Sequence, residues 1–283
     1  MSRDWSWLLD ELRVTRLRLE LAPRRRFRLP SLPGSMLRGA LGHALAELGD
    51  AHDVLYRGEA LHRGRRVNVP GPYLPEWRGR VGGWKEAGER YHLDLVLLGQ
   101  ARRFAADIAV AAGRAAPRGL GEDRVPHDLI TRRLIERPGG TPLRQLLPSL
   151  PPEAARRLCL RTLTPVRLAK GHQEAERPTF ERLFARSEQR LRGLVRFHVG
   201  VEPPAPDVEL AERSRAVRVQ PDWRFAAVTR QATRHGRLKV GGFLGRLELA
   251  GELTPFLPLL QAVTVLHLGA KSTLGHGRVA IAA

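Results

Sequence analysis

The sequence predicts an α+β protein made of two successive units that repeat one order of strands and helices. Three observations support this prediction. Strand-like and helix-like patterns alternate through residues 1–137, the same order begins again after a proline-rich stretch, and 42% of the 283 residues are hydrophobic, enough for a core. Chain length fits one large domain or two of about 130 to 150 residues, and domain sizes in general favour two.

The first unit is predicted to run from residue 1 to 137. Residues 14–22 alternate apolar and polar side chains, which is typical of a half-buried strand. Ser35 is expected to cap the helix that follows it, with leucine and alanine recurring at helical spacing through Leu45. Residues 51–90 give no clear pattern beyond turns and short strands. The remaining elements are a strand at 91–98, a helix at 101–114 and an extended segment at 129–136.

Residues 138–156 are predicted to link this unit to a second one at 157–283, because five prolines and two glycines lie between positions 138 and 152. Each unit follows the order of a ferredoxin-like, or RRM-like, α+β fold. The second unit is expected to contain a strand at 157–169, a helix at 178–197 capped by Thr179, two short strands within 216–231 broken at Pro221, a glycine-rich strand at 238–249, a helix at 254–266 and a last strand at 279–281.

The chain is strongly basic. It has 48 Lys and Arg against 29 Asp and Glu, a formal net charge of +19, and arginine supplies most of the positive charge. Because the planar guanidinium group matches phosphate and stacks on bases, this composition indicates a nucleic-acid partner. A GC-rich coding sequence is an alternative source of part of the arginine excess.

Several classes of protein are excluded by composition. The single cysteine, Cys159, rules out a disulfide framework and a cysteine-rich zinc site, and it is expected to be a small buried residue. Residues 1–14 carry charges where a signal peptide has an apolar core, and no stretch approaches the roughly 20 apolar residues of a membrane span. We expect a cytoplasmic protein with no membrane partner and no cofactor.

The tail of the chain contains three glycines among basic and hydroxyl side chains, between a helical pattern and a short strand. Glycine allows sharp turns and close approach of the backbone to a ligand, and exposed amides with nearby cations form a site for phosphate. An ordinary tight loop before an edge strand is the alternative. Ala270 stands where a nucleotide P-loop requires glycine. The residues expected to contact RNA here are His267, Gly269, Lys271, Ser272, Gly275, His276, Gly277 and Arg278.

Two further basic segments are candidates for RNA binding. Residues 23–30 combine four arginines with Phe27, so that guanidinium groups can neutralise phosphates while the ring stacks on a base. A solvated run of charges with Phe27 buried is the alternative. The second segment precedes and enters the glycine-rich strand of the second unit. The residues expected to contact RNA are Arg26 from the first segment and Arg230, Arg234, Arg237 and Lys239 from the second.

Five short stretches, taken in order, carry a family likeness. They are Gly34-Ser35-Met36-Leu37-Arg38-Gly39-Ala40-Leu41-Gly42, Leu95-Val96-Leu97-Leu98-Gly99, Arg118-Gly119-Leu120-Gly121, Leu163-Thr164-Pro165-Val166, and His267-Leu268-Gly269 with Gly275-His276-Gly277. Together they resemble the CRISPR repeat-processing endoribonucleases of the RAMP superfamily, and the likeness covers nearly the whole chain. The terminal glycine loop after a helix, combined with two tandem ferredoxin-like units, is its most specific part.

The resemblance implies a metal-independent endoribonuclease that cuts CRISPR precursor RNA within each repeat. In that reaction the 2′-OH attacks the adjacent phosphate, leaving a cyclic phosphate and a 5′-OH. The mature crRNA is expected to stay bound, and other subunits of a CRISPR effector complex are expected partners. The sequence offers no carboxylate cluster of the kind that holds Mg²⁺.

The resemblance also suggests which residues act. His43 matches the place of the general base in or near the first helix, Arg38 is the family-like arginine on that helix, and Arg24 or Arg25 can approach from the preceding loop. Arg38 and His43 are five positions apart, about 140° around a helix, and need not share a face. Family members often pair the base with a Tyr or Lys, and none of the three tyrosines of this chain lies near the start of that helix. Two alternatives remain: a non-catalytic RAMP subunit that binds guide RNA, and a general basic RNA-binding protein.

Overall fold

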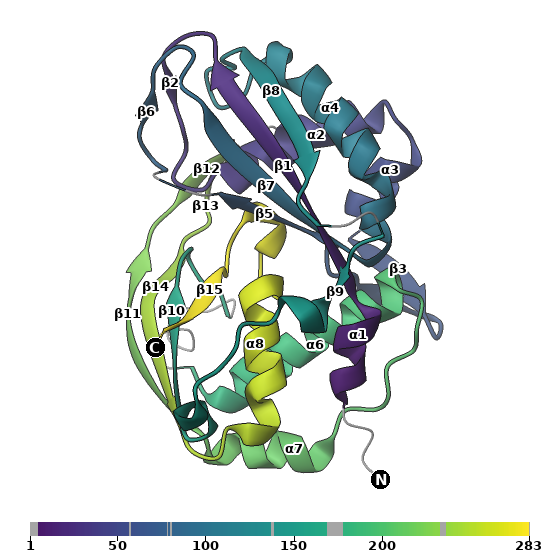
Figure 1. Ribbon diagram of the computed structural model, residues 1–283, viewed down its shortest axis with the longest axis vertical. Coiled ribbons are helices and arrows are strands. Elements are labelled where there is room, and N and C mark those ends of the chain that lie inside the picture. The colour runs from purple at the N-terminus through teal and green to yellow at the C-terminus, as the bar shows by residue number, and fades with distance from the viewer. Residues whose placement is uncertain are drawn as a thin grey trace.

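Figure 1 shows the computed structural model, in which residues 5–56, 58–77, 79, 81–136, 139–168, 178–232 and 236–282 are described. Two antiparallel sheets lie one above the other, and each has its main helices on one face. The upper sheet belongs to the first half of the chain and the lower sheet to the second half. Within the described residues, no helix is both long and apolar enough to cross a bilayer.

The first sheet has the strand order β5-β7-β1-β8. Strand β1 pairs with both β7 and β8, so the first and third main strands of the unit lie at its centre. Helices α2 and α4 cover one face and bury a cluster of leucine, alanine and aromatic side chains against it. The elements are β1 (Arg13–Pro23), α2 (Pro33–Ala46), β5 (Tyr73–Trp77), β7 (Tyr91–Leu98), α4 (Ala105–Arg118) and β8 (His127–Leu134).

The second sheet has the corresponding order β11-β14-β10-β15. Again the first and third strands are central and every pairing is antiparallel. Both sheets therefore have ferredoxin-like topology, which confirms the predicted fold class of two tandem units. The elements are β10 (Arg157–Thr162), α6 (Phe180–His198), β11 (Arg218–Ala226), β14 (Gly242–Ala250), α8 (Leu257–Leu266) and β15 (Val279–Ala282).

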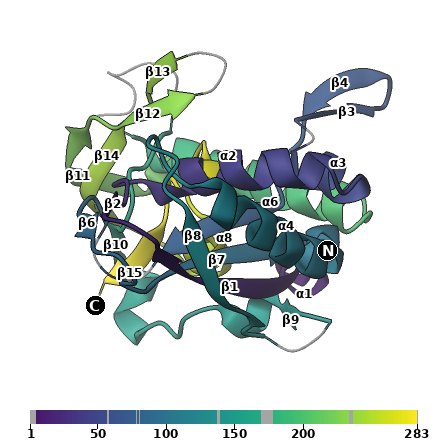
Figure 2. The ribbon, with the colours of Figure 1, turned by 90° about the horizontal axis from the view of Figure 1, so that it is seen from above.

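Smaller elements decorate these units. Two hairpins, β3–β4 and β12–β13, project from the body (Figure 2). The short strands β2 and β6 pair with each other at the far end of the first sheet. Their bounds, with those of three short helices and of one strand that pairs with β1, are α1 (Leu8–Glu11), β2 (Phe27–Arg28), α3 (Asp50–Tyr56), β3 (Glu59–His62), β4 (Arg65–Asn68), β6 (Trp84–Lys85), β9 (Thr141–Pro142), α7 (Val208–Arg213), β12 (Thr229–Ala232) and β13 (Gly236–Lys239).

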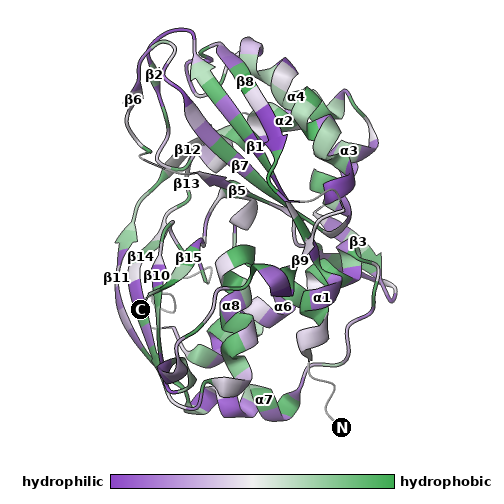
Figure 3. Ribbon diagram, in the orientation of Figure 1, coloured by the Kyte–Doolittle hydropathy of each residue, from purple (hydrophilic) through white to green (hydrophobic). Residues whose placement is uncertain are grey.

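The core of the second unit includes the start of the chain. Leu8, Leu9 and Leu12 are fully buried in the same cluster as the apolar faces of α6 and α8. Leu143, within the predicted linker, is also fully buried there, and β9 beside it pairs with β1. Figure 3 shows green, apolar residues along α8 and parts of α6, and buried members of both helices belong to this cluster. The domain boundaries at 137 and 157 remain a prediction.

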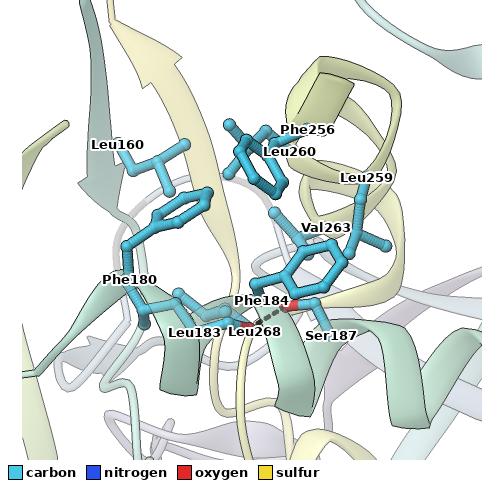
Figure 4. A pocket seen from close by; sticks show the side chains of 10 residues that line it. All are labelled: Leu160, Phe180, Leu183, Phe184, Ser187, Phe256, Leu259, Leu260, Val263 and Leu268. Atoms are coloured by element: carbon cyan, nitrogen blue, oxygen red, sulfur yellow. Dashed lines mark hydrogen bonds between the residues drawn. The ribbon is translucent and has the colours of Figure 1, made fainter. Parts of the chain in front are cut away.

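A small apolar pocket lies within this second core, between α6 and α8 (Figure 4). Phenylalanine and leucine side chains line most of it. Its one hydroxyl, from Ser187, donates a hydrogen bond to the Leu183 carbonyl 2.8 Å away. Because that hydroxyl is already bonded within its own helix, we interpret the pocket as a packing defect of the core.

Three sequence predictions about local structure are wrong. Ser35 does not cap α2, because the helix starts two residues earlier at Pro33, with Leu32 in the N-cap position; proline is well suited to a first helical turn. The strand predicted at 157–169 ends at Thr162. Pro221 does not interrupt β11, which pairs with β14 along its whole length. Since β11 is an edge strand, a proline without an N–H is tolerated there.

Gly277 illustrates how tightly the tail is packed. Its φ is +80°, and a Cβ atom there would lie 2.0 Å from the Leu268 carbonyl oxygen. We expect Gly277→Ala to lower the free energy of unfolding by about 2 to 4 kcal/mol, the sum of left-handed strain and overpacking. Urea unfolding measures this loss.

Gly49 provides the matched control. It has a similar φ of +78° but open space around the Cβ position, so Gly49→Ala should cost only the backbone strain, about 1 kcal/mol. Equal losses in the two variants would contradict the importance of the close approach at Gly277.

Candidate nucleic-acid interface

Helix α2 carries the two residues expected to act in catalysis, and it presents them on different faces. Leu37, Leu41 and Leu45 are buried against the first core and fix the orientation of the helix. Arg38 is half-buried on one side of this apolar face, whereas His43 is exposed to solvent in the last turn. The two side chains therefore have different environments, as their five-residue spacing allows.

Arg38 lies between Tyr56 and Tyr73, which are 18 and 35 positions later in the sequence. Its Nη1 donates a hydrogen bond to the Tyr73 hydroxyl, and its guanidinium carbon lies 4.5 Å from the centroid of the Tyr56 ring. The Tyr56 hydroxyl donates in turn to the Arg38 carbonyl, at 2.7 Å. The arginine thus joins α2 to α3 and β5 through a hydrogen bond and a cation–π contact.

The two tyrosines are poor proton acceptors. Burial is the main reason that the pKa of Tyr56 and the pKa of Tyr73 are raised above the ordinary value, although the charge of Arg38 opposes the shift at both. Both hydroxyls therefore stay protonated at neutral pH. Among the described residues of α2, the exposed imidazole is that of His43.

The glycine loop joins the two units rather than lying free. Its short helical turn, Ser272–Leu274, packs against β5 and against the start of α2. A Cβ atom at Gly34 would lie 2.4 Å from the Leu274 carbonyl oxygen, and one at Gly275 would lie 2.6 Å from the Trp77 ring. Because glycine has no side chain, the backbone of α2 can approach that of the loop at Gly34, and the loop can approach the Trp77 ring at Gly275. The role of these two glycines here is close packing between the units.

A buried carboxylate, Glu76 of β5, lies at the centre of this junction. One of its oxygens is 3.3 Å from Nε2 of His267, and the other is 3.6 Å from Arg278 and 3.8 Å from Arg16. Burial by itself would raise the pKa of Glu76, but the hydrogen bond from His267 and the neighbouring positive charges outweigh it, and the pKa lies below its ordinary value. Glu76 is therefore an anion that links the first unit to the tail.

Several residues predicted to contact RNA are inside the protein. His267 and His276 are 1% and 0% exposed, and Ser272 is also buried. His267 Nδ1 is bonded to the His276 carbonyl at 3.0 Å, and His276 Nε2 is bonded to the Val240 carbonyl. Gly275 and Gly277 are buried and Gly269 is half-buried. Direct contacts from the two histidines and Ser272 are at odds with this burial, and their roles here are structural.

Two cations of the loop differ in access. Lys271 is exposed at the tip, with a left-handed φ of +63° and its carbonyl accepting from the Leu274 amide at 2.8 Å. Arg278 is partly exposed but donates to the Trp77 carbonyl at 2.9 Å, besides facing Glu76. Lys271 is therefore the loop cation most available to a phosphate.

The arginines of residues 23–30 gather at the end of the first sheet where β2 and β6 lie. Arg24 is paired with Asp128 at 2.8 Å, and Arg25 donates to the Asp123 carbonyl. Arg26 lies over the Trp84 ring, at 4.6 Å, and faces Glu86. Phe27 is buried, as the less specific interpretation of this segment expected. None of these contacts involves α2, so the structure does not bring Arg24 or Arg25 together with Arg38.

Two basic hairpins flank α2. Figure 2 shows β12–β13 and β3–β4 extending from the same side of the body with α2 between them. The first hairpin includes Arg230, Arg237 and Lys239, whose side chains lie outside the described residues, as does the whole of Arg234.

The second hairpin, β3–β4, was missed by sequence reasoning. Arg63, Arg65 and Arg66 surround its turn and are exposed. Glu202, which follows α6, pairs with Arg63 at 3.4 Å and so fixes the hairpin to the second unit. A turn-forming glycine between basic residues was the available signal. Within the described residues, no group of three or more His, Cys, Asp or Glu side chains is arranged to hold a metal.

Two segments of the chain match models of known protein families. Residues 160–279 match the family model described as CRISPR-associated endoribonuclease Cas6, and residues 12–51 match a second model described as an N-terminal domain. No curated protein sequence matches the chain.

Solved structures cover nearly the entire fold. The chain is similar to a Cas6 product complex, with a TM-score of 0.58, 18% identity and coverage of 95% of this chain and 99% of that one. It is also similar to Thermus thermophilus Cas6, with a TM-score of 0.54, 16% identity and coverage of 96% and 99%. A third structure, a RAMP protein binding different RNA substrates, has a TM-score of 0.55, 14% identity and coverage of 95% and 100%.

The fold is that of a tandem ferredoxin-like protein, similar to solved structures of Cas6 and of a RAMP protein. The family model that matches residues 160–279 is that of the Cas6 endoribonuclease. The resemblance to CRISPR repeat-processing endoribonucleases drawn from the sequence is thereby confirmed.

Proposed function

We propose that this protein is an endoribonuclease that cleaves CRISPR precursor RNA within its repeats without a metal ion. The observation that carries the proposal is the exposed His43 on α2, in a protein with the Cas6 fold, between two hairpins rich in basic residues. A hairpin of the repeat would lie across α2, with its phosphates facing the arginines of β3–β4 and β12–β13 and the loop cation Lys271.

The chemistry proposed is transesterification within the RNA. His43 takes the proton of the 2′-OH, the oxygen attacks the adjacent phosphorus, and the bond from phosphorus to the 5′ oxygen breaks. The leaving oxygen takes up a proton, so the products are a cyclic phosphate and a 5′-OH. Nearby cations stabilise the charge that develops on the phosphate.

Arg38 has a positioning role in this proposal. Its guanidinium group is engaged by Tyr56 and Tyr73, which leaves it little freedom to meet a scissile phosphate but holds α2 against α3 and β5. Lys271 is the better candidate among the described residues for a cation near the RNA backbone. Product retention is part of the proposal, because the flanking hairpins contact the RNA stem that remains after cleavage.

The experiment is cleavage of an RNA that contains the repeat of the protein's own locus, in buffer with excess EDTA. We expect a single cut at the 3′ side of the hairpin, with a cyclic phosphate on the upstream fragment and product formation that stops near one turnover. An RNA with a deoxyribose at the cut site should bind equally and remain intact. Binding without cleavage in any buffer would instead favour the non-catalytic guide-RNA subunit.

A further inference from the structure

The second sheet has a charged outer face that the proposed site does not use. Strands β10, β11 and β14 turn alternate residues away from α6 and α8, and five exposed arginines lie on this side with two acids. We call this surface the arginine face; its charged members are Arg157, Arg161, Arg218, Arg224 and Arg246, with Asp222 and Glu248.

The strand register brings two of these arginines face to face. Arg161 of β10 is directly opposite Arg246 of β14, where side chains of an antiparallel pair are neighbours. Asp222 is opposite Arg246 on its other side. Like charges in directly opposed positions destabilise a sheet. The face nevertheless keeps five positive side chains against two negative ones, a composition suited to an anionic ligand.

These guanidinium groups lack the ion pairs that several other surface arginines have. Arg24, Arg118 and Arg215 each lie within 3 Å of a carboxylate oxygen. Among the described residues, the five arginines of the arginine face have no ion pair to a carboxylate within 4 Å. Their charges are therefore available to a ligand, at a cost to the sheet that a bound anion would offset.

The arginine face is continuous with the proposed RNA interface. Strands β11 and β14 lead directly towards the β12–β13 hairpin that flanks α2 (Figure 1). A strand of RNA that leaves the hairpin site past β12–β13 would thus meet this sheet next. Leu163, exposed at the end of β10, adds an apolar contact for a base.

We propose that the arginine face binds the single-stranded RNA that flanks the repeat hairpin, through its phosphates and without sequence preference. This inference rests on the proposed function for the identity of the ligand. A single strand suits a twisted sheet because its backbone can follow the rows of arginines while its bases turn outward.

The test compares two RNAs, the repeat hairpin alone and the same hairpin with a uridine-rich single-stranded flank on each side. In Arg161→Gln/Arg246→Gln, we expect affinity for the flanked RNA to fall about tenfold near 0.1 M salt, and the slope of log K against log salt to decrease by about 1.4, for two lost phosphate contacts. Affinity for the hairpin alone and its cleavage rate should not change. The midpoint of thermal unfolding should be equal or higher, because the opposed charges are gone.

Arg186→Gln/Arg213→Gln is the matched control. It removes the same charge from exposed positions on α6 and α7, on the helical side of the same unit, and should leave both affinities unchanged. If the wild-type protein binds the flanked RNA more tightly than the hairpin and the Arg161/Arg246 variant does too, the inference is overturned. If the wild-type protein binds both RNAs without cutting, the proposed function fails while the flank comparison still decides this inference.

Discussion

His43→Ala is expected to reduce single-turnover cleavage of repeat RNA by about 10² to 10⁴-fold, the range typical of a lost general base. The side chain is exposed and is not part of either core, so the variant should fold normally and bind RNA with unchanged affinity. Gel-based cleavage under enzyme excess, with a binding titration on the deoxyribose-containing RNA, separates the two effects.

His52→Ala is the control for this variant. His52 is a partly exposed histidine on the neighbouring helix α3, stacked on Tyr56 with ring centroids 5.0 Å apart. We expect it to retain cleavage within a few-fold of the wild-type protein. A His43→Ala variant that cleaves at the wild-type rate would remove the histidine from the mechanism and leave a site built from cations alone.

The second large effect is expected at Glu76. Glu76→Gln removes the negative charge that faces His267, Arg278 and Arg16 in a buried setting. Breaking a buried ion pair on one side typically costs about 3 to 5 kcal/mol. Glu76 and His267 are buried, whereas Arg16 and Arg278 are partly exposed and Arg16 also pairs with Glu136, so the loss should lie near the lower end of this range. We expect a loss of this size in the free energy of unfolding at pH 7, measured by urea titration.

The Glu76→Gln substitution should also change how the free energy of unfolding depends on pH. The pKa of Glu76 is lower in the folded protein than its ordinary value of 4.5, so its contribution to stability is complete above about pH 4.5 and is lost as the pH falls through the folded-state pKa. The wild-type protein should therefore lose stability relative to Glu76→Gln in that acid range. Glu89→Gln, an exposed carboxylate paired with Lys85, is the control and should leave stability at pH 7 unchanged. A Glu76→Gln variant as stable as this control would show that the junction does not depend on the charge.

The order of elements could be predicted from the sequence because it depends on local patterns. Strand β7 was predicted at its observed bounds, and α6 and its Thr179 cap follow from apolar periodicity and a hydroxyl at the helix start. The interruption expected at Pro221 was wrong because tolerance of proline depends on whether a strand is central or at an edge, which is set by the whole sheet.

The site was harder to predict because its partners are distant in sequence. His267 resembled an RNA contact in a glycine-rich loop, but its partner Glu76 is 191 positions away and turns the histidine into a buried bond between the units. Arg38 likewise meets Tyr73, 35 positions later, a contact that no local sequence pattern indicates. The position of His43 within α2, by contrast, was predicted from the helical spacing of the apolar residues around it.

The burial of Leu8, Leu9 and Leu12 beside α6 has a consequence for biosynthesis. These leucines are translated before α6 and α8, whose apolar faces shield them and which follow more than 160 residues later. During synthesis the nascent chain must hold this apolar segment exposed, or in provisional contacts, until the carboxy-terminal half emerges. The second unit therefore completes its core around a segment that precedes the first unit's sheet in the sequence. A bulky fusion placed close before Leu8 would disturb the second unit more than the first.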